Sequence, residues 1–317
     1  MRIAVVGSNL RYLCRFRANL IHRLQDEGHE VLAITSDPLG PEFDGLAASG
    51  CHYAQVPNMT VSTNPVRVLA TATRLRRALT EYGVESVFTY GAKPILVTAL
   101  AAWSSSRQID WFAMFAGLGI PFTRLEKTNV KTSIARITQV WMIRALLPRA
   151  AAVVVQNKDD AQDIQRIAKH RLSSTPVHII DGSGVNLDEY KHVPTFPETT
   201  TFIFVGRLLK SKGIGEFLEA AKEITRQGLD ARFHVVGAPD ENPDAVSTAY
   251  LDQFQDLSTV IFHGHVPKVA DLLKDSSVFV LPSYYREGIP RSGLEALAIG
   301  RPIIANVILF IRSGSWA

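Results

Sequence analysis

Short runs rich in β-branched residues alternate with amphipathic helical stretches along nearly the whole of this 317-residue chain. Such alternation is typical of parallel sheets built from strand–helix–strand units. The runs that we expect to form strands are residues 2–7, 30–35, 52–56, 86–90, 110–115, 152–156, 177–181, 201–206, 231–237, 259–263, 278–281 and 302–305. The expected helices are residues 12–26, 65–82, 94–105, 128–147, 158–169, 214–227, 243–256, 269–275 and 290–299. The sequence therefore predicts an α/β protein with two series of parallel strands.

A stretch rich in glycine and proline interrupts this alternation. It begins with Gly182-Ser183-Gly184-Val185-Asn186 and continues into a proline-containing segment at 193–198. Such composition is typical of a connection between domains. We therefore predict an N-terminal domain at 1–181, a linker at 182–200 and a C-terminal domain at 201–317.

Composition excludes several other classes of protein. Hydrophobic residues make up 46% of the chain and charged residues 20%, as in ordinary globular proteins, which excludes disorder, collagen and coiled coils. The two cysteines, Cys14 and Cys51, show no zinc-binding or disulfide-scaffold spacing, which favours a reducing compartment. No run approaches the roughly 18 apolar residues of a spanning helix, and the N-terminus resembles a core strand rather than a secretory signal. We expect a cytoplasmic protein and assign it no nucleic-acid partner.

The basic residues are concentrated in the first half of the chain. The first 150 residues carry 17 Lys and Arg against 10 Asp and Glu. Within residues 121–150 the basic side chains are Arg124, Lys127, Lys131, Arg136, Arg144 and Arg149, interleaved with apolar residues that include Trp141. This pattern predicts a basic amphipathic helix, which either lies on an anionic bilayer or is a domain helix with solvated arginines.

Two glycine-containing turns follow expected strands in the first half. Gly7-Ser8-Asn9 precedes the helix that carries Arg17, and a glycine turn can leave the first amides of a helix facing an anion. Gly117-Leu118-Gly119 follows the strand that ends at residue 115. Each pattern fits either close approach of a ligand or an ordinary tight turn. The sequence contains neither a dinucleotide-binding glycine motif nor a P-loop.

The first turn of the second half carries two cations. The segment 201–214 runs from a buried strand through Gly206, Arg207 and Lys212 into a helix. A guanidinium offers fixed paired donors to phosphate oxygens and an ammonium acts as a movable point charge, so the two together suit a diphosphate. A solvated basic turn is the alternative interpretation of this segment by itself.

A second motif, residues 287–295, follows an expected strand and leads into a helix that ends before Gly300. It holds two carboxylates, Glu287 and Glu295. Pro290 suits the first helical turn, and the neighbouring amides can bind an anion. We expect Glu287 to accept hydrogen bonds from sugar hydroxyls and Glu295 to accept them from a ribose diol. The alternative is a loop acid followed by a solvated helix acid.

Together these motifs resemble those of the retaining glycosyltransferases of family four. That family has the GT-B fold, in which two Rossmann-like domains face a cleft. The matching segments in the second half are Gly206-Arg207-Leu208 with Lys212-Gly213, Gly182-Ser183-Gly184-Val185-Asn186, Phe262-His263-Gly264-His265-Val266 and residues 287–302. The segments Phe16-Arg17, Thr89-Tyr90-Gly91-Ala92-Lys93-Pro94 and Gly117-Leu118-Gly119 resemble motifs of the branch that glycosylates polyprenyl-diphosphate-linked intermediates.

The resemblance implies transfer of a hexose or an N-acetylhexosamine from a UDP-sugar to a polyprenyl-diphosphate-linked acceptor, with retention and without a metal or other cofactor. It implies that Glu287, Arg207 and Lys212 are catalytic. The implied donor-binding residues are Gly206, Arg207, Lys212, His265, Glu287, Gly288, Ile289, Pro290, Arg291 and Glu295. The implied acceptor-side residues are Gly7, Ser8, Asn9, Arg17, Gly117 and Gly119. The helix within Arg124–Arg149 then has a use in holding the first domain at the inner face of the cell membrane.

The chain departs from the family pattern after Ala305. The family continues into further strand–helix units, whereas this chain reads Asn306-Val307-Ile308-Leu309-Phe310 and stops at Ala317. We therefore expect a truncated or frameshifted second domain that lacks one strand and its closing helices. Two alternative functions stay open: a UDP-GlcNAc 2-epimerase, and a nucleotide-binding remnant without turnover.

Overall fold

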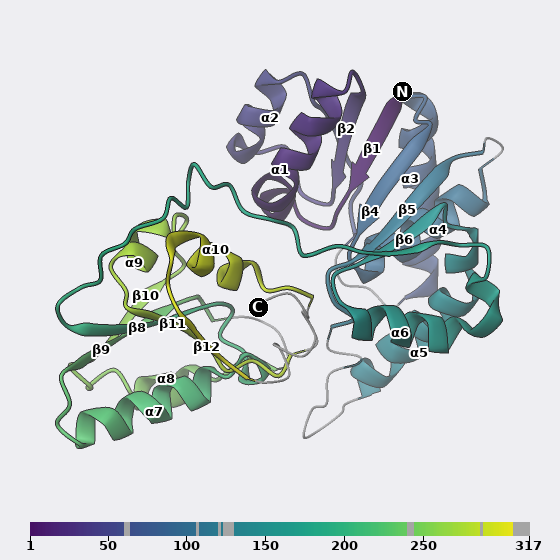
Figure 1. Ribbon diagram of the computed structural model, residues 1–317. Helices are drawn as coiled ribbons and strands as arrows, with labels where there is room; N and C mark the ends of the chain where they lie inside the picture. The colour runs from purple at the N-terminus through teal and green to yellow at the C-terminus, as the bar shows by residue number, and fades with distance from the viewer. Residues whose placement is uncertain are drawn as a thin grey trace. The chain divides into compact units, whose positions relative to one another are not determined.

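The computed structural model describes residues 1–59, 64–105, 108–119, 122, 130–239, 244–285 and 288–306. These residues form two compact units (Figure 1). The first unit contains Met1–Phe122 and ends at Ser183, and the second begins at Gly184. The candidate residue Glu287 and the unusual segment 307–317 lie outside the described residues.

The first unit is built on a parallel sheet with the strand order β3-β2-β1-β4-β5-β6-β7. Its strands are β1 (Arg2–Val6), β2 (Glu30–Thr35), β3 (His52–Gln55), β4 (Ser86–Tyr90), β5 (Asp110–Phe115), β6 (Ala152–Val155) and β7 (Val177–Ile179). Each begins at the residue predicted from the sequence, and β1, β2 and β6 follow nearly continuous apolar runs, as strands covered on both faces do. The strand order reverses between β1 and β4, and α/β sheets bind ligands outside the carboxyl ends at such a point.

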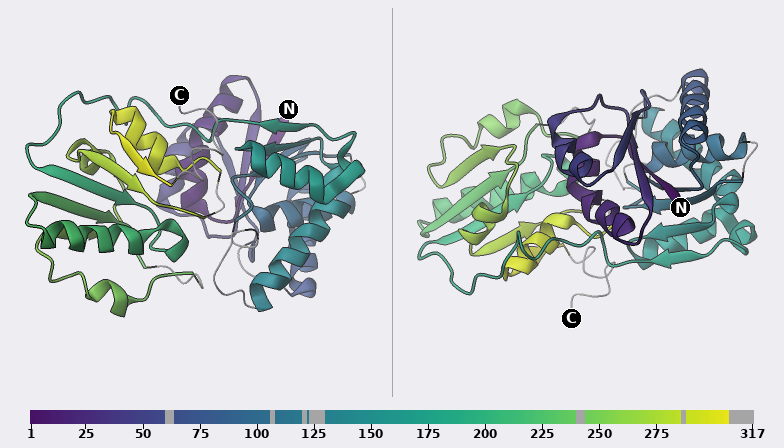
Figure 2. Two further views of the ribbon diagram at one scale, coloured as in Figure 1. Left: turned by 60° about the horizontal axis from the view of Figure 1, so that its bottom comes forward. Right: turned by 90° about the horizontal axis from the view of Figure 1, so that it is seen from above.

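Helices cover both faces of this sheet (Figure 2). They are α1 (Leu10–Asp26), α2 (Asp44–Ala48), α3 (Pro65–Glu81), α4 (Ala92–Trp103), α5 (Val130–Ala145) and α6 (Lys158–Ala168). Three of them begin after an asparagine, Asn9, Asn64 or Asn157, whose side chain accepts a hydrogen bond from an amide of the first turn. The sequence did not predict α2, which has only five residues.

Neighbouring residues of the central strands enter two different cores. Val5 packs with Leu13 of α1, whereas Val6 belongs to the larger cluster that includes Leu75 of α3 and Ile143 of α5. Successive side chains of a strand point to opposite faces, so one apolar run can serve both layers of helices.

The second unit has a parallel sheet with the strand order β10-β9-β8-β11-β12. Its strands are β8 (Thr200–Val205), β9 (Ala231–Val236), β10 (Val260–Gly264), β11 (Val278–Leu281) and β12 (Ile303–Ala305), and its helices are α7 (Ile214–Arg226), α8 (Thr248–Asp252), α9 (Ala270–Lys274) and α10 (Arg291–Ile299). Helices α7 and α8 lie on one face of the sheet, and α9 and α10 lie on the other (Figures 1 and 2). The prediction of two parallel α/β sheets is therefore confirmed. The strand order reverses between β8 and β11.

The predicted helix over 243–256 is wrong. In this segment, α8 spans only Thr248–Asp252. The preceding residues instead pair with the turn after β8: Leu209 and Ala245 form an isolated antiparallel bridge, and the Val246 amide donates to the Leu208 carbonyl at 3.0 Å. These tertiary hydrogen bonds hold the backbone out of a helical path.

The chain that enters the second unit is tied to the end of α10. The Arg301 guanidinium is almost fully buried and donates to the carbonyls of Val193 and Thr195 at 3.1 and 2.8 Å. Its carbon lies 4.7 Å from the centre of the Phe196 ring. The Val193 amide donates to the Ile299 carbonyl at 2.9 Å. Part of the predicted linker thus packs against the second unit.

Candidate functional site

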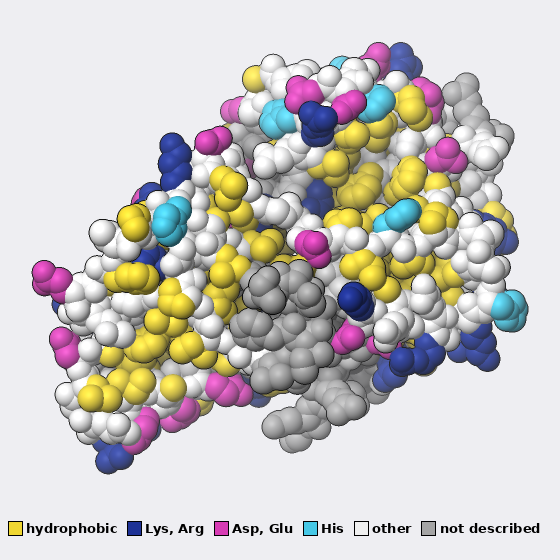
Figure 3. Space-filling view, in the orientation of Figure 1, with side chains coloured by type: hydrophobic (Ala, Val, Ile, Leu, Met, Phe, Trp, Pro, Cys, Tyr) yellow, Lys and Arg dark blue, Asp and Glu magenta, His cyan; other side chains and the backbone are white. Residues whose placement is uncertain are grey.

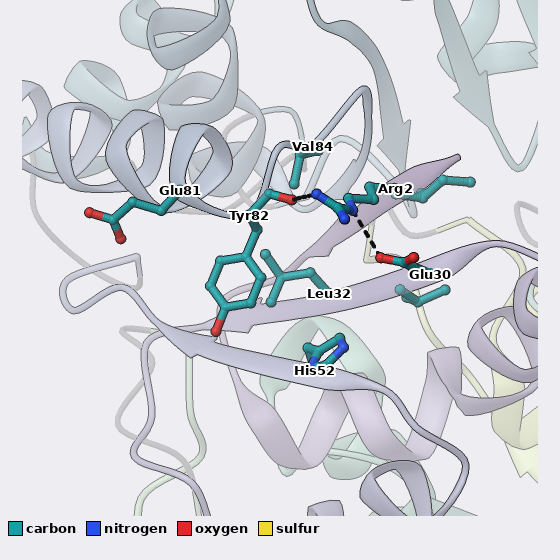
Figure 4. Close-up of a pocket in the computed structure, with 9 residues that line it drawn as sticks. Arg2, Glu30, Leu32, His52, Glu81, Tyr82 and Val84 are labelled. Carbon is teal, nitrogen blue, oxygen red and sulfur yellow. Dashed lines mark hydrogen bonds and ion pairs between the residues drawn. The ribbon is translucent and has the colours of Figure 1, made fainter.

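One cavity of the first unit lies away from the motif residues. It has a volume of about 240 Å³ and is lined by residues that include Arg2, Glu30, His52 and Tyr82 (Figure 4). Arg2 and Glu30 form a 2.9 Å ion pair there, but both side chains are more than half exposed. These residues stand at the amino ends of their strands or just before a strand, whereas ligands of α/β sheets bind at the carboxyl ends. The carboxyl ends of the strands, at the opposite edge, are therefore the expected place for a site.

In the second unit, the turn after β8 brings two cations to one aromatic ring. The guanidinium carbon of Arg207 lies 5.7 Å from the centre of the Tyr285 ring, and the Lys212 ammonium lies 5.5 Å from it. Arg207 is exposed, whereas Lys212 is only 9% exposed. Cation–π attraction thus brings both side chains to one tyrosine. The turn therefore places two cationic side chains at the carboxyl end of β8.

Ser211 connects this turn to two other segments. Its amide donates to a carboxylate oxygen of Asp244 at 3.1 Å, and its hydroxyl donates to the same oxygen. Its carbonyl accepts from the amides of Tyr284 and Tyr285 at 2.8 and 3.0 Å and from the hydroxyl of Ser283 at 3.3 Å. Ser211 is fully buried. Through Ser211, the loop at 244 and the loop at 283–285 fix the turn that carries Arg207 and Lys212.

Gly213 ends this turn and begins α7 with a left-handed backbone, φ +78°. A Cβ atom at this position would lie 2.5 Å from the carbonyl oxygen of Pro282. Only glycine therefore allows the turn to approach the chain that leaves β11. The close approach joins the carboxyl ends of two neighbouring strands, β8 and β11.

The helix α10 carries a buried ion pair. The Arg291 Nε donates to the Glu295 Oε1 at 3.0 Å, and the side chains are 19% and 3% exposed. Gly288 and Ile289, just before the helix, are both buried. Pro290 is not in the first helical turn as predicted but is the N-cap, with extended backbone and no side-chain cap. With ψ at 120°, Pro290 lies outside the helical conformation, while its carbonyl accepts hydrogen bonds from the amides of Gly293 and Leu294 in the first turn.

Histidines lie near the end of β10. The exposed His265 follows this strand directly. The rings of His234, in β9, and His263, in β10, have centres 4.9 Å apart. Burial lowers the pKa of both imidazoles, and for His234 the neighbouring His263 and Arg232 lower it further. Motif reasoning included His263 only as part of the segment around His265.

In the first unit, Gly7 is explained by packing against Tyr90. A Cβ atom at residue 7 would collide with the Tyr90 hydroxyl. The helix that follows does not begin with free amides as expected: the Leu10 amide donates to a carboxylate oxygen of Asp37 at 2.7 Å, and the Tyr12 amide donates to the Asn9 side chain at 3.1 Å. The carboxylate disfavours an anion at this helix start.

Arg17 lies buried at the same edge of the sheet, only 5% exposed. Its guanidinium donates to the Ser183 hydroxyl at 3.0 Å and to the Met114 sulfur at 3.3 Å, and lies 4.6 Å from the centre of the Tyr90 ring. Three strand ends thus converge on one cation: Tyr90 ends β4, Met114 lies in β5, and Ser183 follows β7. Ser8, after β1, accepts from the Ser36 amide through its carbonyl.

Gly117 and Gly119 have left-handed backbones, with φ values of +113° and +71°. Such positive φ angles favour glycine, and they are compatible with both a tight turn and the close approach of a ligand. The Leu118 carbonyl between them accepts from the buried Gln139 side chain of α5 at 3.4 Å. The turn is therefore attached to α5.

The basic helix predicted over 128–147 is α5. Ile134, Ile137 and Trp141 are 42%, 69% and 49% exposed, and their i, i+3, i+7 spacing places them on one face. Arg136 and Arg144 are also exposed. Of the other predicted basic residues, Arg124 and Lys127 lie outside the described residues, nothing is described of the Lys131 side chain, and Arg149 lies 5.4 Å from the Trp103 ring centre.

Sequence reasoning missed Asp244, Ser211 and Tyr285 as parts of the site. Asp244 is remote in sequence from the turn that it holds, and no local pattern marks it. Tyr285 stands just before the 287–295 motif, so its position was a usable signal. Among the described residues, no helix is long and apolar enough to cross a membrane, and no three His, Cys, Asp or Glu side chains are grouped to hold a metal ion.

Two family models match this chain. The model for the glycosyl transferase 4-like domain matches residues 15–180, and the model for glycosyl transferases group 1 matches residues 199–310. Among curated relatives, the N,N'-diacetylbacillosaminyl-diphospho-undecaprenol alpha-1,3-N-acetylgalactosaminyltransferase of Campylobacter jejuni is 25% identical over 96% of this chain and 80% of its own length. The alpha-D-kanosaminyltransferase of Streptomyces kanamyceticus is 28% identical over 60% of this chain and 53% of its own length.

Solved structures share the fold across nearly the whole chain. Sucrose-phosphate synthase from Thermosynechococcus elongatus has a TM-score of 0.75 at 18% identity, covering 98% of this chain and 83% of its own. Anabaena Alr3699/HepE in complex with UDP and glucose has a TM-score of 0.68 at 16% identity, covering 96% and 80%. At such low identities the likeness is evidence for the fold alone.

Proposed function

Because this chain belongs to the glycosyltransferases whose 4-like and group 1 domains match its two halves, and has their GT-B fold, we propose that it transfers a hexose or an N-acetylhexosamine from a UDP-sugar. The acceptor is a polyprenyl-diphosphate-linked sugar. The transfer retains the configuration at the anomeric carbon and serves the synthesis of a polysaccharide or glycan.

The observation that carries this proposal is the placement of Arg207 and Lys212 against the Tyr285 ring. When the bond between the sugar and UDP breaks, negative charge develops on the leaving diphosphate. Two cations already held at the end of β8 stabilise that charge without reorganising, and this is electrostatic catalysis. The guanidinium can bind two phosphate oxygens at once, and the ammonium supplies a third contact. Positive charge from these residues is also our reason to propose that no metal is required.

The helix α10 supplies the groups for the remainder of the donor. Glu295 accepts a hydrogen bond from Arg291 that orients its carboxylate, and a carboxylate is a suitable acceptor for the hydroxyls of a ribose diol. Gly288, Ile289 and Pro290 lead into this helix, and we place the donor sugar beside them with Glu287 and His265. In this proposal Glu287 contacts the sugar and acts with Arg207 and Lys212 in catalysis.

The first unit receives the acceptor. The Campylobacter relative is named for a diphospho-undecaprenol acceptor, which supports a lipid-linked acceptor for this chain. We place it at the carboxyl ends of β1, β4 and β5, where Gly7, Ser8, Asn9 and Arg17 lie, together with Gly117 and Gly119.

A surface of α5 supports a position at the inner face of the cell membrane. The apolar face formed by Ile134, Ile137 and Trp141 is exposed, and Lys and Arg side chains gather along the edge where α5 and α6 lie (Figure 3). An apolar face flanked by cations can enter the interface of an anionic bilayer. This placement brings the enzyme to an acceptor that is itself anchored in lipid.

The test is incubation of the full chain with a panel of UDP-sugars and polyprenyl-diphosphate-linked sugars, followed by the mass of the extracted lipid. We expect a gain of one hexose or N-acetylhexosamine, formed equally in EDTA, with an α-linkage from an α-linked donor by NMR. Reactions without acceptor distinguish the transferase from the alternative enzyme: interconversion of UDP-sugars in the absence of acceptor indicates an epimerase. Binding of UDP without any glycosylated lipid indicates a nucleotide-binding remnant.

A further inference from the structure

Two polar groups at the carboxyl end of β4 are buried without a hydrogen-bond partner. They are the Tyr90 hydroxyl and the Lys93 ammonium, and neither atom contacts an acceptor or donor in the described part of the chain. A donor that loses its hydration on burial and forms no hydrogen bond destabilises the fold, and a buried charge destabilises it most. Both residues are half-buried, and the polar ends of their side chains are withdrawn from water.

The two groups come from one short stretch of chain. Tyr90 is the last residue of β4, and Gly91 then turns with φ +88° into α4, whose first turn contains Lys93. The Tyr90 hydroxyl lies close to Gly7, which follows β1, and the Arg17 guanidinium lies 4.6 Å from the centre of the Tyr90 ring. The stretch therefore stands where the strand order reverses between β1 and β4.

The charges around this stretch favour an anion. Hydrogen bonds to the Phe16 carbonyl, the Ser183 hydroxyl and the Met114 sulfur hold the Arg17 guanidinium beside the Tyr90 ring. Burial lowers the pKa of Lys93. Burial also raises the pKa of Tyr90, which keeps its hydroxyl protonated and able to donate. Two cations and a neutral donor are a complement for phosphate oxygens.

We propose that Tyr90 and Lys93, beside Arg17, bind the diphosphate of the lipid-linked acceptor in the first unit. This inference rests on the proposed function and adds to it a second phosphate-binding site, separate in residues from the one at Arg207 and Lys212. The acceptor diphosphate supplies the partners that the Tyr90 hydroxyl and the Lys93 ammonium lack.

The experiment compares Lys93→Met and Tyr90→Phe with the parent chain, using farnesyl diphosphate and UDP as probes in isothermal titration calorimetry. We expect Lys93→Met to weaken farnesyl diphosphate binding at least about tenfold and Tyr90→Phe about three- to tenfold, with UDP affinity unchanged within about twofold. Lys158→Met, at an exposed lysine of the same unit, is the matched control and should leave both affinities unchanged. Arg207→Ala should show the opposite pattern, losing UDP but not farnesyl diphosphate.

Inorganic pyrophosphate and thermal unfolding complete the test. If the variants bind pyrophosphate as well as farnesyl diphosphate more weakly, the result supports contact of these residues with phosphate. If the parent chain binds farnesyl diphosphate more tightly than pyrophosphate, the result indicates that the site takes a lipid-linked diphosphate. Lys93→Met should unfold at the same or a higher temperature, because it removes a buried charge. If Lys93→Met does not fold, Tyr90→Phe decides alone, since it removes one oxygen.

The proposal is overturned if both variants bind farnesyl diphosphate as the parent chain does. It is also overturned if UDP affinity falls in parallel, because the probe then occupies the other site. Failure of the parent chain to bind UDP would instead contradict the proposed function. The farnesyl diphosphate measurement would still test the site at Tyr90 and Lys93.

Discussion

The Nε of Arg291 lies 3.0 Å from the Oε1 of Glu295, one turn further along α10, and the carboxylate is almost entirely withdrawn from water. A buried carboxylate is costly unless a cation and hydrogen bonds offset the loss of hydration. Arg291 therefore offsets the burial of the Glu295 side chain and orients its oxygens toward the position proposed for a ribose diol. The donor-binding role proposed for Glu295 depends on its neighbour in the helix.

Removing only one partner of this pair should destabilise the protein more than removing both. We expect Arg291→Met to lower the free energy of unfolding by about 3 kcal/mol, and the double variant Arg291→Met/Glu295→Leu to recover at least about 1 kcal/mol of that loss. Urea unfolding measures both. The exposed pair Arg226–Glu223 serves as the control, and Arg226→Met should barely move the midpoint. A double variant less stable than the single one contradicts this account.

The two cations of the turn after β8 should matter for UDP, and a third on the same turn should not. We expect Arg207→Ala and Lys212→Ala each to weaken UDP binding about 10- to 100-fold, because each removes charge-assisted hydrogen bonds to phosphate. Lys210, three residues from Arg207, is exposed, and Lys210→Ala is the matched control. Calorimetry that shows equal affinity for all three variants removes the site assignment.

Gly213 should tolerate no side chain, unlike another glycine of the same helix region. Gly213→Ala combines a left-handed backbone with a collision against the Pro282 carbonyl. We expect it to lower the free energy of unfolding by about 3 kcal/mol or more and to abolish UDP binding. Gly228 has a similar φ of +70° but open space around it, so Gly228→Ala should cost only about 1 kcal/mol. Chemical unfolding of the two variants measures the difference, and equal losses argue against the close approach.

Asp244 should act on UDP binding through Ser211. Asp244→Ala removes the acceptor for the Ser211 amide and hydroxyl, which loosens the turn between Arg207 and Lys212. We expect about a tenfold weaker affinity for UDP and a smaller change for uridine, which has no phosphate. Ser211→Ala added to Asp244→Ala should have little further effect, since both act through one contact. Asp256→Asn, at an exposed position of the same unit, is the control. Additive losses in the double variant contradict the link.

The second unit should lose stability as the pH falls below 6.5. Burial lowers the pKa of His234 and His263, so the unfolded chain binds more protons than the folded one in this range. Stability is therefore greatest above pH 6.5 and declines as the pH falls toward the lowered values. Arg232 adds to the effect at His234 and Asp275 opposes it. Urea unfolding at pH 5 and pH 8 should show a smaller difference for His234→Phe and His263→Phe than for the parent chain or for His170→Gln, at an exposed position. An equal change in the free energy of unfolding between pH 5 and pH 8 in the parent chain and in the His234 and His263 variants would contradict this prediction.

Much of the fold could be predicted because its information is local. In the first sheet, each strand begins where its β-branched run begins, and three helices begin after the asparagine that caps them. The helix over 243–256 failed because pairing of Ala245 and Val246 with the turn after β8 outweighed a helical pattern. At the turn Gly7-Ser8-Asn9, the Leu10 amide donates to Asp37, which is remote in sequence, and no local pattern could predict that contact.

The sequence by itself determined the two parallel sheets, the charged residues at their carboxyl ends and the family motifs, because periodicity and short motifs are properties of neighbouring residues. Only the tertiary structure decided that Arg207 and Lys212 both lie near the Tyr285 ring and that Asp244 holds Ser211. It also decided that the Tyr90 hydroxyl and the Lys93 ammonium are buried without a hydrogen-bond partner among the described residues. Burial and hydrogen-bond partners depend on which distant segments the sheet brings side by side. No pattern of neighbouring residues carries that information.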